Sequence, residues 1–290
     1  MKKFKDSELI LNPDGSVYHI HLRPEDVADT VILVGDQHRV PVISKHFDKI
    51  EVKKAGREFV THTGTLNGKR LTVLSTGIGT DNIDIVVNEL DAAVNIDLGK
   101  RIPKEKHTAL NLIRLGTSGA LQPGLEVDSF VASAYGLGFD GLLNFYHYDE
   151  KILEKEMTEA FIHHTGWNHR LPYPYIIKGS EMLLKKLAYG MPSGITATAN
   201  GFYGPQGRQL RIPLAFPELN EKIEDFCFDN QRITNFEMET SAIYALGRIL
   251  GHHTLTICDI IANRVTKQFS KDYKASVEKM IQLVLERLTS

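Results

Sequence analysis

Val31-Ile32-Leu33-Val34-Gly35-Asp36 decides the fold of this chain, because it is a run of four apolar residues that stops at a glycine. Such a run, bounded by a turn residue, is typical of a buried strand that opens into a loop. The pattern returns where the apolar segment 109–115 ends in Gly116-Thr117-Ser118-Gly119. We therefore expect two buried strands, each ending in a glycine-containing loop.

Helical and strand patterns alternate on both sides of these two segments. Residues 58–65 and 70–75 flank Asn67-Gly68, a strong signal for a β-hairpin. Apolar residues recur at helical spacing over 83–96. Alternation of this kind predicts an α/β protein with ligands at the carboxyl ends of its strands. Further helices are expected at 180–189, 218–228, 238–250 and 272–288, further strands at 193–200 and 254–262, and no element between 166 and 174.

The overall composition argues against some classes of binding partner. The 290 residues carry a formal charge of −2, from 34 Lys and Arg against 36 Asp and Glu, with no basic block interleaved with aromatics. We therefore expect no nucleic-acid partner. Cys227 and Cys258 lack metal or redox spacing, which favours reduced thiols in the cytoplasm. Because no signal-peptide core and no apolar run near the roughly 20 residues of a membrane span occur, we expect a cytoplasmic protein without membrane association.

The segment Phe202-Tyr203-Gly204-Pro205-Gln206-Gly207-Arg208 combines an aromatic pair, a Gly-Pro turn and two planar hydrogen-bonding groups. Gln206 offers an amide donor and an amide acceptor, and Arg208 offers a rigid fork of donors. This set complements the lactam edge of uracil, which shows carbonyl, N–H and carbonyl in order. The simpler interpretation is an ordinary turn.

Two segments that follow strands could hold an anion. Gly35 and Arg39 lie in the first of them, and Arg114 and Thr117 lie in the second. Arg114 belongs to an apolar run, so it needs an anion or a carboxylate nearby. Backbone N–H groups, the Thr117 hydroxyl and two guanidinium groups would form a phosphate cradle; a structural salt bridge is the alternative. Neither segment has the spacing of a Walker loop.

Glu237-Met238-Glu239 places two carboxylates at the expected start of a helix. A carboxylate can accept hydrogen bonds from adjacent sugar hydroxyls, and Met238 offers an adaptable apolar contact to a sugar face. The alternative is a favourable interaction with the helix dipole alone.

Taken in order, these segments resemble the nucleoside phosphorylase family, from about Tyr18 to the C-terminus. Gln206-Gly207-Arg208 resembles the element that reads uracil, and Asn263-Arg264 ends the last strand where purine-specific relatives carry an aspartate. Both features favour the pyrimidine branch. The resemblance implies an α/β fold with a mixed central β-sheet flanked by helices. No linker divides the chain, so residues 1–290 are expected to form one domain, with residues 1–17 as a candidate extended N-terminal segment.

Roles for individual residues follow from the resemblance at matching positions. Arg208, Gln206 and Arg114 would be catalytic. His19, or alternatively His21, would reach from one subunit to the ribose bound by its neighbour. Arg57 would likewise reach the neighbour's phosphate. No metal and no cofactor is implied beyond phosphate as co-substrate. The remaining assignments are phosphate to Gly35, Arg39, Arg57, Arg114 and Thr117; ribose to His19, Thr117, Met238 and Glu239; and base to Phe202, Gln206, Arg208 and Arg264.

The implied reaction is phosphorolysis of the N-glycosidic bond of uridine, which gives uracil and ribose 1-phosphate. A purine nucleoside phosphorylase, a hydrolytic nucleosidase and a non-catalytic nucleoside-binding protein are the alternatives. Asn82 stands where some bacterial relatives use a serine to bind a monovalent cation, so that ion is doubtful. Residues 212–233 differ from the usual bacterial segment, and a lid is expected over 209–233, which leaves open the choice among uridine, deoxyuridine and thymidine. Homodimer and homohexamer are equally compatible with the sequence.

Overall fold

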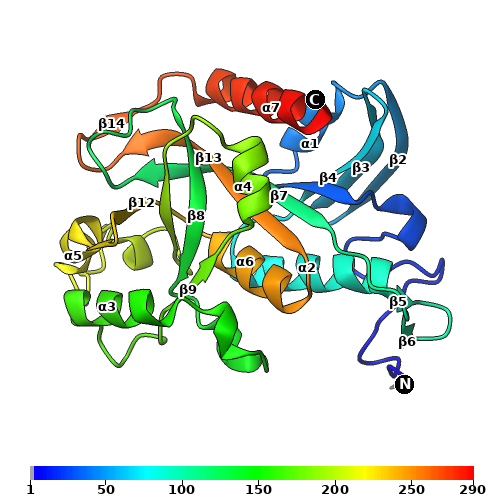
Figure 1. Ribbon diagram of the computed structural model, residues 1–290, viewed down its shortest axis with the longest axis horizontal. Coiled ribbons are helices and arrows are strands. Elements are labelled where there is room, and N and C mark those ends of the chain that lie inside the picture. Colours follow the sequence, from blue (N-terminus) through cyan, green and yellow to red (C-terminus); the bar gives the residue numbers. More distant parts are fainter. Residues whose placement is uncertain (1–2) are drawn as a thin grey trace.

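The computed structural model describes residues 3–290 and is built around one large mixed sheet (Figure 1). Its strands follow the order β11-β12-β10-β8-β13-β7-β1-β4-β3-β2, and β9 and β14 pair with β8 and β13. The strands of this sheet are β1 (Thr30–Val34), β2 (Lys49–Gly56), β3 (Phe59–Leu66), β4 (Lys69–Ser75), β7 (Asn111–Ala120), β8 (Phe130–Gly138), β9 (Tyr175–Lys178), β10 (Ser193–Thr198), β11 (Cys227–Phe228), β12 (Gln231–Glu237), β13 (His253–Asn263) and β14 (Gln268–Phe269). The short strands β5 (Ile96–Asp97) and β6 (Ile102–Pro103) form a separate pair.

The sheet contains two groups of parallel strands that run in opposite directions. One group is β4-β1-β7-β13, and the other is β8-β10-β12. The antiparallel pairs β13–β8 and β12–β7 join the groups, so β7, β13, β8, β10 and β12 close into a ring. Through the β12–β7 pair, the carboxyl ends of the two groups meet.

The structure corrects the expected end of the β7 strand. The strand was predicted to stop at Leu115, but β7 continues to Ala120. β13 pairs along its whole length, and β12 adds the pairs Asn235↔Ala120 and Phe236↔Gly119. Long-range pairing of this kind overrides the low strand propensity of glycine. Thr117 therefore lies on a strand rather than in a loop.

Helices cover the sheet on more than one side (Figure 1). α2 and α6 share one core cluster, α4 and α7 pack in a second, and α3 and α5 flank a third. In α2, Ile83, Val86, Val87 and Leu90 are fully buried, as their spacing predicted. The helices are α1 (Arg39–Ser44), α2 (Thr80–Asn95), α3 (Lys155–Thr165), α4 (Glu181–Leu187), α5 (Leu219–Asp225), α6 (Thr240–Ile249) and α7 (Tyr273–Thr289), with short 3-10 turns at Pro24–Asp26, Leu142–Phe145, Glu150–Ile152 and Gly204–Gln206.

Most predicted elements are present. Asn67 and Gly68 both have positive φ (50° and 75°), as the tight turn between β3 and β4 requires. Ser180 caps α4 by accepting from the Leu183 N–H. Of the range 209–233 that was expected to form a lid, α5, β11 and β12 occupy much, and the longest stretch outside named elements is 209–218.

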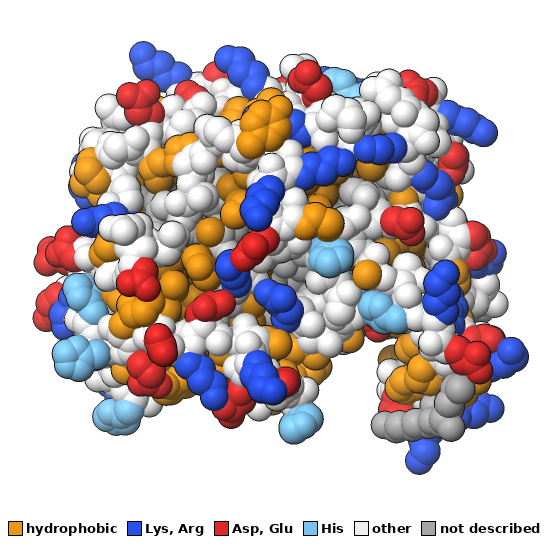
Figure 2. All heavy atoms as spheres, viewed as in Figure 1, with side chains coloured by type: hydrophobic (Ala, Val, Ile, Leu, Met, Phe, Trp, Pro, Cys, Tyr) orange, Lys and Arg blue, Asp and Glu red, His pale blue; other side chains and the backbone are white. Residues whose placement is uncertain are grey.

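Basic and acidic side chains are interspersed on the face drawn in Figure 2. Among residues 3–290, no helix combines the length and the apolar character that crossing a bilayer requires. Of the candidate N-terminal segment 1–17, residues 1–2 lie outside the described part of the chain.

Candidate active site

Arg114 lies at the centre of the region where the two strand groups meet. Its guanidinium is ion-paired with Glu239 and lies 3.5 Å from Glu237 Oε2, and only 5 % of the residue is exposed. Although burial opposes the charge, the two carboxylates raise the Arg114 pKa above its ordinary value. The structure therefore satisfies Arg114 with carboxylates, and these include the residue predicted to grip ribose.

Arg39, which is half-buried, provides a second cation at the same place. It begins α1, and its Nη1 donates to the carbonyl of Leu115 (3.0 Å). Burial, and next the charge of Arg114, lower the Arg39 pKa. Gly35 lies next to Arg39: a Cβ at this position would be in ordinary van der Waals contact with Arg39 Nη2 (3.6 Å) and with the carbonyl of Gly77 (3.4 Å). An anion bound here would offset the repulsion between the two guanidinium groups.

Glu239 links the starts of two helices. Its Oε1 accepts from the N–H of Gly79, at the start of α2 (2.7 Å), while its Oε2 meets Arg114. Met238 beside it is half-buried. The carboxylate predicted to bind sugar hydroxyls is thus fixed by one backbone donor and one guanidinium.

Glu237 is a site residue to which sequence reasoning assigned no role. Its carboxylate accepts from the backbone N–H groups of Glu239 and Thr240 (3.0 Å each) and from Thr198 Oγ1 (2.6 Å). Burial raises its pKa, with Arg114 opposing that effect. Glu237 therefore fixes the turn that presents Met238 and Glu239, as a capping carboxylate does. The sequence signal for Glu237 was its position in Glu237-Met238-Glu239, where it lies two residues before the other carboxylate.

Gln206 and Arg208 face each other in the loop after β10. Gln206 is 2 % exposed, and its Oε1 accepts from Arg208 Nη1 (2.6 Å). The same Nη1 donates to the Phe202 carbonyl (2.7 Å), and the guanidinium carbon lies 3.9 Å from the centroid of the Phe202 ring. The three predicted base-binding residues of this loop therefore form one contact group.

Arg264, at the end of β13, joins this group from another strand. Its Nη2 donates to the Gln206 carbonyl (2.5 Å), and its guanidinium lies 5.4 Å from the Phe236 ring centroid. Nη1 is buried and has no hydrogen-bond partner among residues 3–290. Burial, with Arg208 adding to it, lowers the Arg264 pKa to about 10. Two guanidinium groups thus concentrate positive charge at the predicted base end.

His19, His21 and Arg57 lie together, but within residues 3–290 they form no hydrogen bond or ion pair with Arg39, Arg114 or Glu239. His19 Nδ1 is 2.6 Å from Glu89 Oε1, and the His21 ring lies 2.7 Å from the position of a Cβ on Gly56. Arg57 is exposed with φ 53°, and among residues 3–290 it forms no ion pair. The chain alone does not bring these three residues to the phosphate and ribose groups.

Comparison with known proteins places this arrangement in a family. The family model described as the phosphorylase superfamily matches residues 29–289. The chain belongs to the phosphorylase superfamily. This identifies the mixed sheet and its flanking helices as a nucleoside phosphorylase fold, as the resemblance predicted.

Several members of the phosphorylase superfamily are similar over most of the chain. A uridine phosphorylase from Thermococcus kodakarensis is 33% identical over 273 residues, which cover 93% of this chain and 86% of the relative. A purine nucleoside phosphorylase from Clostridium perfringens is 27% identical and covers 92% of this chain and 97% of its own. The crystal structure of a Trypanosoma brucei nucleoside phosphorylase that shows uridine phosphorylase activity has a TM-score of 0.85, 29% identity, and coverage of 97% of this chain and 99% of its own.

A cavity of about 710 Å³ lies beside the loop that carries the predicted base-binding residues. Tyr203, Gly207 and Arg208 line one side, and Trp167 lines another. Segment 210–216 completes the lining. The sequence offered no signal for this cavity, because its walls come from three distant parts of the chain.

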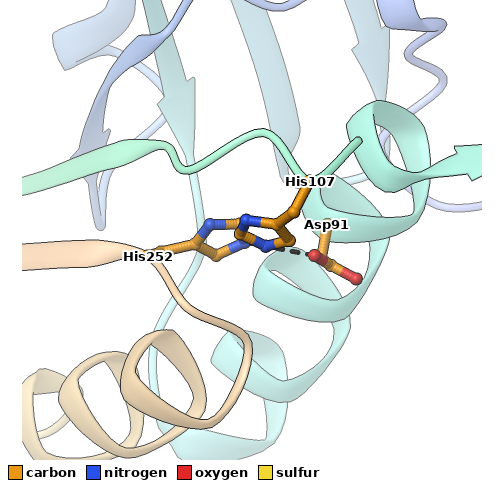
Figure 3. Close-up of side chains that lie close together, drawn as sticks. All are labelled: Asp91, His107 and His252. Atoms are coloured by element: carbon orange, nitrogen blue, oxygen red, sulfur yellow. Dashed lines mark ion pairs between the residues drawn. The ribbon is translucent and has the colours of Figure 1, made fainter. Parts of the chain in front are cut away.

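Asp91, His107 and His252 form the cluster in Figure 3, whose ligand-type atoms lie within 4.8 Å of one another. His252 Nδ1 accepts from the Leu110 N–H (3.2 Å), so in the neutral ring the proton is on Nε2, which lies 3.4 Å from Asp91 Oδ1. A metal at Nε2 would require the proton on Nδ1, opposite that N–H. We therefore interpret the cluster as structural.

Proposed function

We propose that this protein catalyses the phosphorolysis of uridine, with inorganic phosphate as the second substrate. The observation that carries the proposal is the group formed by Gln206, Arg208 and Arg264, which combines amide and guanidinium groups suited to uracil with a concentration of positive charge. The Arg39 and Arg114 pair beside Glu239 supports a site for phosphate next to ribose. The relatives from Thermococcus kodakarensis and Trypanosoma brucei support the same activity.

The chemistry follows from where charge develops. A phosphate oxygen forms a bond to the ribose C1′ while the bond from C1′ to the uracil nitrogen breaks, and the electron pair leaves with uracil. Arg208 and Gln206 stabilise the negative charge that appears on the base, which is preorganised electrostatic catalysis. Arg39 and Arg114 position the phosphate, so the attack becomes effectively intramolecular. Glu239 holds the sugar hydroxyls that keep C1′ in line.

One assay tests the function: release of base from uridine or inosine, with and without phosphate. We expect uracil release that requires phosphate. Equal release without phosphate would indicate a nucleosidase, and preferential release from inosine would indicate a purine enzyme. Tight uridine binding without turnover would indicate a binding protein.

We further propose that two subunits share each active site, with Arg57 and His19 reaching the neighbour's phosphate and ribose. The support is the exposure of Arg57 and its left-handed backbone (φ 53°). Strain of this kind in a non-glycine residue persists where structure or function requires it. A homodimer is the smallest assembly that meets the requirement, and a cytoplasmic location agrees with the two free cysteines.

No monovalent cation is needed in this proposal. Asn82 Nδ2 donates to Glu58 Oε1 (3.3 Å), so an amide N–H, rather than an oxygen ligand, faces this carboxylate. Activity should therefore be the same in potassium and in tetramethylammonium buffers. Loss of activity in tetramethylammonium, restored by potassium, would contradict the proposal.

A further inference from the structure

Asn220 packs directly against the loop that carries Gln206 and Arg208. It lies near the start of α5, and its Nδ2 donates to the Gln206 carbonyl (3.0 Å). Gly207 makes this approach possible: its φ is 67°, and a Cβ there would lie 1.9 Å from Asn220 Nδ2. The contact therefore depends on a glycine between the two base-binding side chains.

The Gln206 carbonyl is held from two sides. Arg264 Nη2 donates to it at 2.5 Å, and Asn220 Nδ2 donates at 3.0 Å. This carbonyl belongs to the peptide unit that joins Gln206 to Gly207. Rotating that unit would turn the Gln206 side chain and would also displace Arg208, two residues on. Fixing the carbonyl therefore fixes the relative placement of both groups.

Asn220 also connects this loop to the lid. The lid, residues 209–218, begins directly after Arg208 and ends directly before α5, so both of its ends converge near the Gln206 carbonyl. Leu210 and Ile212 within it are 70% and 82% exposed. A lid with so few buried contacts moves easily. Its movement can reach the base-binding residues through α5 and Asn220.

We propose that Asn220 is a positioning residue that holds Gln206 and Arg208 in the geometry that stabilises departing uracil. The proposal rests on the proposed uridine phosphorolysis. Within residues 3–290, Asn220 forms no hydrogen bond with Arg39 or Arg114, the residues of the proposed phosphate side of the site. Its loss should therefore weaken stabilisation of the leaving group and leave phosphate binding unchanged.

Asn220→Leu tests this, because leucine keeps the approximate shape of asparagine and removes the donor; Asn220→Ala is the second variant if the first does not fold. We expect kcat/KM for uridine to fall about tenfold, the effect of one lost hydrogen bond on a rate. The KM for phosphate should not change. The loss should be smaller with 5-fluorouridine, whose base leaves more readily and depends less on Gln206 and Arg208.

Glu221→Gln, on the exposed side of the same helix, is the matched control and should behave as wild type. If wild-type protein releases no uracil, the proposed function fails. If wild type is active and the Asn220 variants equal it, the positioning role is wrong. Equal losses with uridine and 5-fluorouridine, or a raised KM for phosphate, would also overturn it, because either result indicates general disruption of the site.

Discussion

Arg208 is the residue whose removal should separate chemistry from phosphate binding. Its guanidinium contacts Gln206 and Phe202, and no hydrogen bond or ion pair within residues 3–290 joins it to the residues predicted to bind phosphate. Arg208→Ala should lower kcat for uridine about 10²–10³-fold, the usual cost of losing one donor to a developing anion. Uracil release measured at varied phosphate should show an unchanged KM for phosphate. Arg170→Ala, at an exposed position, is the control, and an unchanged kcat in Arg208→Ala would contradict the leaving-group role.

A second prediction for a single residue concerns Asp259 and the stability of the fold. It is fully buried, its Oδ1 accepts from Ser276 Oγ (2.7 Å), and its Oδ2 has no hydrogen-bond partner among residues 3–290. Burial, with Asp128 adding to it, raises its pKa from 3.8 to about 6. Because the folded pKa exceeds the unfolded one, ionisation opposes folding, and the stability contributed by Asp259 falls as pH rises from 3.8 to about 6.

Asp259→Asn should therefore raise the free energy of unfolding by about 1–3 kcal/mol at neutral pH. Below pH 3.8, where Asp259 is protonated in both states, the gain should vanish. Urea unfolding at the two pH values measures this, with Asp29→Asn at an exposed position as the control. An equal gain at both pH values would contradict the electrostatic cause.

Individual residue types were predictable where their chemistry conflicts with their surroundings. Arg114 stood out because a charge in an apolar run needs a partner, and the structure supplies Glu237 and Glu239. Asn220 could not be predicted, because its importance arises only from the close approach to Gly207. Polar residues without a sequence anomaly become visible only through their tertiary contacts.

Helices and strands were predictable where their signals are local in the sequence, and they were missed where they depend on distant contacts. The hairpin at Asn67-Gly68 and the helix α2 were predicted because turn chemistry and apolar spacing are local. The sequence left α3 unassigned, since its buried positions include Thr158 and Thr165 and its exposed side carries histidines. The extension of β7 was missed because it depends on pairing with β12 and β13, which lie more than a hundred residues away.

Movement of segment 209–218, the expected lid, can be followed through one side chain. Trp167 is the single tryptophan of the chain, lines the cavity beside the lid, and packs 4.8 Å from Phe139, centroid to centroid. If the lid closes over bound uracil, water leaves this cavity, and the emission of Trp167 should shift to shorter wavelength. A fluorescence titration with uracil measures the shift, and Trp167→Phe should abolish it. Unchanged emission at saturating uracil would mean that the lid does not close over the cavity.

The arrangement of the whole sheet explains why the individual motifs could be recognised from the sequence, whereas their close approach in the fold could not be predicted. Segments after β1, β4 and β13 belong to one parallel group, and the segments after β10 and β12 belong to the oppositely directed group. The sequence pattern predicted that ligands bind at the carboxyl ends of the strands of one sheet. It gave no signal for the ring that the β12–β7 pair closes. That closure places Glu239 against Arg114, and so brings together the predicted sugar and phosphate parts of the site.

The last prediction concerns the assembly. If Arg57 serves a neighbour's site while Arg208 serves its own, then a dimer of one Arg57→Ala and one Arg208→Ala chain has one intact site and one doubly impaired site. Random pairing of two inactive variants should then restore about a quarter of the wild-type sites. Co-expression with two different tags, followed by uracil-release assays, measures this. Pairing Arg39→Ala with Arg208→Ala is the control: both groups serve their own chain's site, so no activity should return. A mixed Arg57→Ala and Arg208→Ala sample no more active than its parents would show that Arg57 does not act across the interface.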